Sequence, residues 1–192
     1  MDEVVRRSLA RWPNVPAVFG WAVLDRRGNW RLREPGSERF SRIGNAALRD
    51  FIARNYAHDE RGRWFFQNGP QRVYVRLECT PLVYRLEGAR LADHCGRVAG
   101  ALRGVWLDDE GGMVLEAGQG VGVLDDRDLA ALLGHIVDET GAPLEARLVA
   151  LLERAPRAGR AYLALAGERL ELGVIEARTL AERFGFVADP RP

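Results

Sequence analysis

The alternation of apolar and polar positions is clearest over residues 64–78, where it predicts a two-stranded antiparallel ribbon. Asn68-Gly69 separates the two strands, and this dipeptide is the strongest short-range signal for a hairpin turn. Trp64 and Phe66 share one face of the first strand. In the return strand the two alternating sets are Val73, Val75 and Leu77 against Arg72, Tyr74, Arg76 and Glu78. One face of the ribbon is therefore apolar and the other carries arginines.

Helical spacing of apolar residues and capping signals predict five helices, over 2–11, 45–56, 126–136, 144–154 and 175–183. Asn45 is the expected N-cap of the second helix, and the polar run His58-Asp59-Glu60 follows the end of that helix. Further hairpins are predicted over 19–33, 82–94, 105–116 and 162–172, with a short strand over 121–124.

The two halves of the chain are similar in pattern. Gly20–Gly28 resembles Gly104–Gly111, and each segment is followed by a helix and then by a hairpin with a central glycine, Gly69 or Gly167. We therefore predict a duplicated hairpin–helix–hairpin unit, with an N-terminal half over 1–100 and a related C-terminal half over 101–192, in one compact domain or two. The fold class is α+β, with antiparallel β-hairpins packed against helices, because the strands do not alternate regularly with crossover helices.

Composition narrows the class of protein. A chain of 192 residues with 47% apolar content has enough core for one ordinary domain or a compact pair of halves. It has no apolar run near the roughly 20 residues that span a bilayer, and its start does not resemble a signal peptide. Two cysteines, Cys79 and Cys95, do not make a disulfide framework. We expect a soluble, cytoplasmic, bacterial protein.

Every one of the 28 basic residues is an arginine, which a GC-rich genome explains, so arginine content by itself is poor evidence for nucleic-acid binding. The distribution of charge is more informative: residues 1–85 carry a balance of +7 and residues 86–192 one of −6. Such asymmetry either marks a polyanion site or lets the two halves, or the two subunits of a homodimer, attract each other. We favour attraction between the halves or subunits over a polyanion site.

The segments His58–Val75 and Arg183–Val187 resemble a family of uncharacterised proteobacterial proteins that is defined only as a domain of unknown function. The resemblance runs through nearly the whole chain. The order of elements is also distantly similar to that of a second uncharacterised bacterial family of α+β fold. The resemblance implies an α+β fold and cytoplasmic residence, and it transfers no activity and no catalytic residue.

His58, Asp59 and Glu60 are the candidate centre of an enzyme or of a metal site, together with His94 and Cys95. No close-spaced pair of metal ligands supports this, and a solvated helix end explains the run as well. His135 is expected in the core or at its boundary. We therefore predict no catalytic residue, no metal and no cofactor, and the enzyme or metal-binding reading stays an alternative.

Two further motifs favour turns over chemistry. Gly118–Gly122 resembles a phosphate loop, but a strand follows it and acids precede the next helix, where they would repel a phosphate. The acid clusters 108–110 and 125–128 lack the alternating spacing of a calcium loop, and turns and helix starts explain them. The chain also lacks the serine elbow of a hydrolase.

The ribbon offers the best binding hypothesis. Arg61–Phe66 resembles the arginine–glycine–aromatic strand with which some RNA-binding sheets stack bases, and it is equally compatible with a covered core. The candidate ligand-binding residues are His58, Asp59, Glu60, Arg63, Arg72, Tyr74 and Arg76. We predict a non-catalytic binding or interaction module for a protein partner or an anionic small molecule. A nucleic-acid-binding sheet is a further, less favoured alternative, and no membrane partner is expected.

Overall fold

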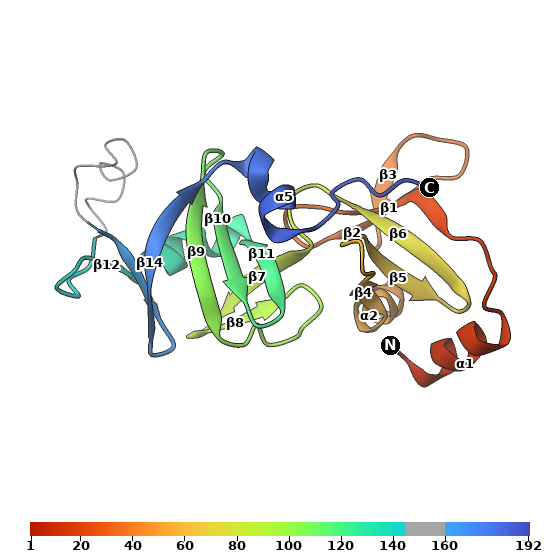
Figure 1. Cartoon of the computed structure of the whole chain (residues 1–192), viewed down its shortest axis with the longest axis horizontal. Helices are drawn as coiled ribbons and strands as arrows, with labels where there is room; N and C mark the ends of the chain where they lie inside the picture. Colours follow the sequence, from red (N-terminus) through yellow and green to blue (C-terminus); the bar gives the residue numbers. More distant parts are fainter. Residues whose placement is uncertain (145–159) are drawn as a thin grey trace. The chain divides into compact units, whose positions relative to one another are not determined.

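The computed structural model describes residues 1–144 and 160–192 (Figure 1). Within it the chain divides into two compact units. Unit 1 comprises residues 1–81, 94–96 and 178–192, and unit 2 comprises residues 82–93 and 97–177. The helix predicted over 144–154 lies outside the described residues, except for its first residue. The α+β class predicted from the sequence is confirmed.

Unit 1 is built on a six-stranded sheet with the strand order β3-β2-β1-β6-β5-β4. Its strands are β1 (Val18–Leu24), β2 (Trp30–Arg33), β3 (Phe40–Arg42), β4 (Tyr56–His58), β5 (Trp64–Asn68) and β6 (Gln71–Leu77). The predicted ribbon is confirmed as β5 and β6, with Phe65 opposite Tyr74 and Phe66 opposite Val73.

The helices of unit 1 are α1 (Glu3–Arg11), α2 (Ala46–Arg54) and α5 (Leu180–Phe184), the last preceded by the short 3₁₀ helix η2 (Ala177–Thr179). Asn45 caps α2 as predicted, because its side chain accepts a hydrogen bond of 3.1 Å from the N–H of Leu48. Ile52 of α2 is buried in the core, as are the aromatic side chains Trp30, Tyr56, Trp64 and Phe66. Trp64 and Phe66 are therefore core residues.

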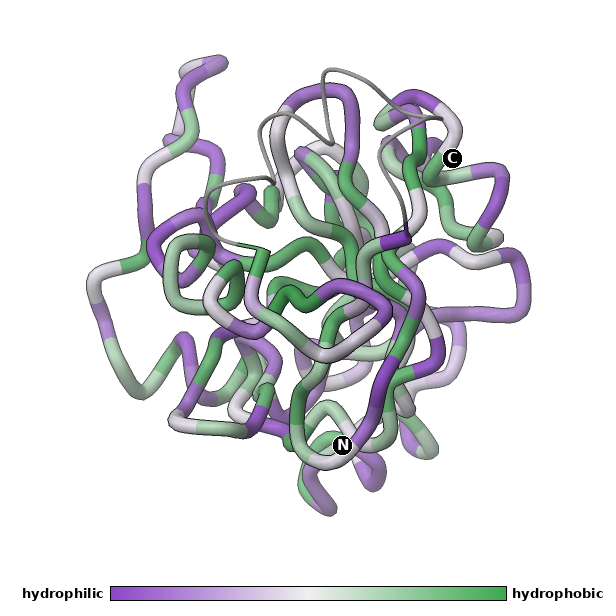
Figure 2. Tube along the Cα trace, turned by 90° about the vertical axis from the view of Figure 1, so that its left-hand side faces the viewer, coloured by the Kyte–Doolittle hydropathy of each residue, from purple (hydrophilic) through white to green (hydrophobic). Residues whose placement is uncertain are grey.

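Unit 2 is built on an eight-stranded sheet with the strand order β12-β13-β14-β9-β10-β11-β7-β8. Its strands are β7 (Leu82–Glu87), β8 (Arg90–Asp93), β9 (Leu102–Asp108), β10 (Met113–Ala117), β11 (Gly120–Leu124), β12 (Ile136–Val137), β13 (Tyr162–Leu165) and β14 (Glu168–Ile175). The 3₁₀ helix η1 (Asp126–Asp128) leads into α3 (Leu129–Leu133). In the tube of Figure 2, hydrophobic stretches gather towards the middle of the trace, and many of the projecting loops are hydrophilic.

Three strand pairs differ from the antiparallel sheets that we predicted. β1 pairs with β6, β14 with β9 and β11 with β7, and all three pairs are parallel, so both sheets are mixed. The hairpins themselves are antiparallel, as expected. A parallel pair needs a long connection, and here each connection contains other strands of the same sheet. Between β1 and β6, and between β9 and β14, it also contains a helix. The prediction of antiparallel sheets rested on the absence of simple helical crossovers, which are the usual way to connect parallel strands.

Four local assignments also change. The helix predicted to reach Tyr56 ends at Arg54, and Tyr56–His58 forms β4 instead, so the run at His58 does not follow a helix. The helix predicted over 126–136 is limited to η1 and α3, because Gly134 ends it and Ile136 enters β12. His135 precedes that strand and is partly exposed. The short strand β3 was not predicted.

Both sheets follow one plan. In each, three consecutive antiparallel strands, a helix and three more antiparallel strands follow along the chain, and the first strand pairs in parallel with the last. The β7–β8 hairpin is added at the edge formed by β11. We propose that this shared plan comes from duplication of one three-strand–helix–three-strand unit, in which β1–β6 correspond to β9–β14.

A recurring turn supports the duplication. Turns of the pattern Asp-x-x-Gly begin at Asp25, Asp59, Asp93, Asp108 and Asp138. In each, the aspartate Oδ1 accepts the backbone N–H four residues on, over 2.6–3.0 Å, and the glycine has a φ of 72–88°. The turns at Asp25 and Asp108 follow the first strands of the two proposed repeats, and the turns at Asp59 and Asp138 follow their fourth strands. The acids at 108 and 138 are thus explained by turn geometry.

The turn between β13 and β14 contains a strained residue. Ala166 has a φ of 54°, a left-handed conformation that costs an alanine about 1 kcal/mol. We expect Ala166→Asn to stabilise the protein by about 0.5–1 kcal/mol, because asparagine tolerates this conformation. The check is the midpoint of urea unfolding. Gly167→Ala, at a φ of 83° in the same turn, should shift the midpoint in the opposite direction, and equal shifts would contradict the explanation.

Among the described residues, no helix has both the length and the apolar character required to cross a membrane.

Candidate functional site

One face of the unit 1 sheet carries a set of arginines interleaved with aromatic rings. The registers place Arg42 opposite Arg31, Arg31 opposite Val23 and Val23 opposite Arg76, so this row crosses β3, β2, β1 and β6. Side chains two residues apart along a strand share a face, which adds Arg33, Arg72 and Tyr74. We call this the arginine face; it comprises Arg31, Arg33, Arg42, Arg63, Arg72 and Arg76 with Phe19, Trp21, Phe40, Phe65 and Tyr74.

The arginines lie over aromatic rings. The Cζ atom of Arg72 is 4.1 Å from the ring centroid of Phe65, and that of Arg63 is 4.6 Å from the ring centroid of Tyr74. The Cζ atom of Arg76, on β6, is 5.3 Å from the ring centroid of Phe40, on β3, and the strands β1 and β2 lie between β6 and β3. Its side chain therefore extends across β1 and β2, which explains why Val23 is only 1% exposed on this face. Such cation–π contacts hold the guanidinium groups in place.

Asp59 accepts hydrogen bonds from two residues at one corner of the arginine face. Its Oδ2 accepts hydrogen bonds from Nε of Arg63 at 2.8 Å and from the hydroxyl of Tyr74 at 2.9 Å. Its Oδ1 accepts the backbone N–H groups of Arg61 and Arg63, both at 3.0 Å. Burial alone would raise the pKa of the Asp59 carboxyl, but these hydrogen bonds outweigh burial and lower its pKa to about 2. Asp59 therefore remains ionised and fixes Arg63.

The charges on the arginine face are only partly neutralised. Arg31 pairs with Glu78 at 3.6 Å, Arg33 with Glu38, and Arg63 with Asp59 at 2.8 Å. Within the described residues, Arg42, Arg72 and Arg76 have no carboxylate within ion-pair distance. Arg42 and Arg76 are exposed and Arg72 is half-buried. Because the whole chain carries a net charge of only +1, this excess is a local feature.

A β-bulge exposes a tryptophan on the same face. The register between β1 and β6 shifts between Val18 and Ala22, and Gly20 in this bulge has a φ of 71°. Trp21 follows, points to the side opposite Ala22, and is 52% exposed. Before the bulge, Phe19 stacks on Tyr74 with a centroid distance of 4.5 Å. Before the bulge the ring of Phe19 packs on Tyr74, and after it the ring of Trp21 faces solvent.

The structure brings together five of the seven predicted site residues. Arg63, Arg72 and Tyr74 meet directly, Asp59 binds two of them, and Arg76 lies on the same face. Tyr74 is 3% exposed, so it supports the arginines and does not form part of the open surface. His58 and Glu60 are exposed; His58 Nδ1 lies 3.1 Å from the backbone oxygen of Asp59, and its ring packs 5.0 Å from Trp64.

The proposed enzymatic or metal centre does not assemble in the described part of the chain. No cluster of three histidine, cysteine or acidic side chains suited to a metal ion occurs there. The ring of His94 packs near Trp30 and Tyr56, at centroid distances of 5.1 and 5.6 Å. Asp59 already accepts four hydrogen bonds, and a carboxylate with so low a pKa is a weak general base.

Sequence reasoning missed half of the arginine face: Phe19, Trp21, Arg31, Arg33, Phe40 and Arg42. Arg31 and Arg33 do carry a local signal, since they alternate with apolar residues in β2. Arg31 and Arg33 lie near Arg76 only because β1 pairs in parallel with β6, and this pairing joins residues more than 50 positions apart. No local pattern indicates that pairing.

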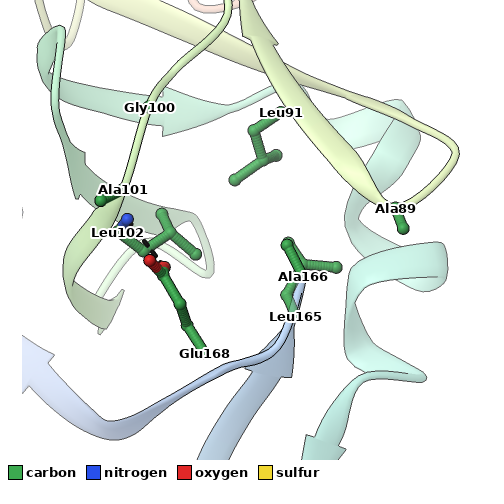
Figure 3. A pocket seen from close by; sticks show the side chains of 8 residues that line it. All are labelled: Ala89, Leu91, Gly100, Ala101, Leu102, Leu165, Ala166 and Glu168. Atoms are coloured by element: carbon green, nitrogen blue, oxygen red, sulfur yellow. Dashed lines mark hydrogen bonds between the residues drawn. The ribbon is translucent and has the colours of Figure 1, made fainter.

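Unit 2 contains a cavity of about 270 Å³ between the β7–β8 turn, the start of β9 and the β13–β14 turn (Figure 3). Its lining is apolar apart from one carboxylate: Ala89, Leu91, Gly100, Ala101, Leu102, Leu165, Ala166 and Glu168. Oε2 of Glu168 accepts the backbone N–H of Leu102 at 2.9 Å. This carboxylate therefore connects β14 to β9, and the cavity offers no charged group comparable to the arginine face.

The fold and this face define an α+β protein with two mixed sheets, one of which bears a surface of arginines on aromatic rings. The family model DUF2944, described as "Protein of unknown function (DUF2946)", matches residues 1–191, and the chain belongs to this family of unknown function. A solved crystal structure of a DUF1285 family protein from Silicibacter pomeroyi DSS-3 is similar, with 15% identity, a TM-score of 0.49 and 87% of each chain covered. No curated protein matches the chain.

Proposed function

We propose that this protein is a non-catalytic binding module whose arginine face binds an anionic ligand. The observation that carries the proposal is the presence of Arg42, Arg72 and Arg76 on one sheet face without a carboxylate partner among the described residues. Three guanidinium groups on one face repel one another, and a bound anion would relieve this repulsion. Ring contacts hold the guanidinium groups of Arg72 and Arg76 in advance, and strand register sets the backbone position of Arg42. Binding would therefore cost less ordering entropy than it would with three freely moving side chains.

The arginine face supports binding better than catalysis, because its groups are permanent cations. A guanidinium group does not exchange protons near neutral pH, whereas it pairs well with phosphate or carboxylate groups. The alternative of a protein partner remains compatible with this face if that partner presents acidic side chains. We keep cytoplasmic location and a homodimer as predictions from the sequence.

The proposal predicts that removing three charges abolishes anion binding. We expect the triple variant Arg42→Gln, Arg72→Gln, Arg76→Gln to bind fluorescently labelled inorganic polyphosphate at least tenfold more weakly than the unchanged protein, because each charged contact contributes to affinity. Fluorescence anisotropy at low salt measures this, and circular dichroism verifies the fold.

The matched control removes the same charge elsewhere. Arg7, Arg90 and Arg103 are exposed and lie on α1, β8 and β9, none of which contributes a residue to the arginine face. Replacing these three by glutamine should leave polyphosphate binding within about twofold, since only long-range charge is lost. If the two triple variants bind equally well, the arginine face is not the site and the proposal fails.

A further inference from the structure

We infer that the ligand of the arginine face is a single-stranded nucleic acid, an inference that rests on the anion-binding function proposed above. The first reason is extent. The guanidinium group of Arg76 lies by the ring of Phe40 on β3, the strand of Arg42, whereas that of Arg72 lies over the ring of Phe65 on β5. β3 and β5 are four strand spacings apart, about 19 Å at the usual spacing. Arg72 lies four residues from Arg76 along β6. A ligand that reaches all three guanidinium groups is extended, as a polymer is, whereas small ligands bind in concave pockets.

The second reason is the aromatic surface beside the charges. Trp21 is 52% exposed and is directed outward after the Gly20 bulge, on the face that carries the arginines. An exposed indole beside guanidinium groups is a platform on which a base stacks while its phosphate pairs with arginine. A linear polyphosphate or an acidic peptide needs only the charges and gains nothing from this ring.

The third reason is the way the arginines are held. Arg63, Arg72 and Arg76 each lie over an aromatic ring, which occupies one side of the guanidinium group. The other side of a guanidinium plane stacks on bases as an aromatic ring does, while its N–H edge donates to phosphate. The arginine face therefore offers groups for stacking and groups for pairing with phosphate. Single strands fit this arrangement better than duplexes, because their bases are accessible.

The experiment compares four labelled probes with the full-length protein: a dT oligonucleotide of twelve residues, the same length of duplex, polyphosphate and poly-glutamate. We expect the oligonucleotide to bind at least tenfold more tightly than the other three, because only it supplies accessible bases. Its log–log salt slope should fall by about 2 in the triple arginine variant, since each phosphate contact on a single strand contributes about 0.7.

Trp21→Ala should weaken oligonucleotide binding about tenfold and leave its salt slope and polyphosphate binding unchanged, whereas Trp21→Phe should retain most of the affinity. Trp12→Ala is the control, because Trp12 is 56% exposed but lies at the end of α1. If polyphosphate or poly-glutamate binds as tightly as the oligonucleotide and Trp21→Ala has no effect, anion binding stands and the nucleic-acid inference is overturned. If no probe responds to the triple arginine variant, both proposals are overturned.

Discussion

Gly62→Ala is expected to destabilise unit 1 by about 3 kcal/mol, the sum of a backbone term and a steric term. Gly62 has a φ of 72°, which costs an alanine about 1 kcal/mol. A methyl group at this position would lie 2.0 Å from the carbonyl oxygen of Gly185, a backbone atom that follows α5. That oxygen belongs to a segment fixed by the hydrogen bond of 2.9 Å from Val187 N–H to Gly62 O. The neighbour therefore cannot move without breaking the pairing of the C-terminal segment.

Urea unfolding followed by tryptophan fluorescence measures this loss, because Trp12, Trp21, Trp30 and Trp64 all lie in unit 1. Gly36→Ala is the matched control: Gly36 lies in the same unit and has a φ of 68°, but no atom lies within 4 Å of the methyl group that the substitution adds. It should lose only about 1 kcal/mol. Equal losses at the two positions would show that φ alone determines the cost and that the contact with Gly185 is unimportant.

The sequence predicted the hairpins well because their signals are local. Asn68-Gly69 and Gly88 mark turns that the structure confirms, and Asn45 marks the start of α2. The same locality explains the failures. The end of α2 was misplaced because Tyr56 continues the apolar helical spacing, yet its ring packs 4.9 Å from Trp30 and 4.8 Å from Trp64 as part of β4. Tertiary packing overrides helix propensity there.

The candidate site was only half predictable for a related reason. Arg72, Tyr74 and Arg76 alternate within one strand, so their shared face follows from sequence. Their relation to Arg31 and Arg42 follows from nonlocal strand pairing. The hydrogen bonds of Asp59 within its turn were not predicted, because His58-Asp59-Glu60 was considered as one polar run. The Asp-x-x-Gly pattern, which recurs along the chain, was the available signal that this aspartate belongs to a turn.

The second large effect is expected at Asp59 and depends on pH. The pKa of this carboxyl is about 2 in the folded protein, against an ordinary value of 3.8. A lowered pKa stabilises the folded state wherever the carboxyl is ionised in the unfolded chain. That contribution is thus present in full above about pH 4 and is lost as the pH falls towards 2. With a side chain only 12% exposed, the pKa difference corresponds to about 2 kcal/mol. Asp59→Asn should remove that amount at pH 7.

The difference in the free energy of unfolding between the unchanged protein and Asp59→Asn should therefore become smaller as the pH falls from 4 to 2. Urea unfolding at a series of pH values measures it. Asp25→Asn is the control, because Asp25 accepts the same backbone hydrogen bonds in an Asp-x-x-Gly turn of unit 1, and its side chain also accepts a hydrogen bond from the neutral amide of Asn29. A loss at Asp59 that is independent of pH would contradict the role of the ionised carboxylate. The hydrogen bonds to Arg63 and Tyr74 would then contribute through geometry alone, and Arg63 would be held in the arginine face mainly by its contact with the Tyr74 ring.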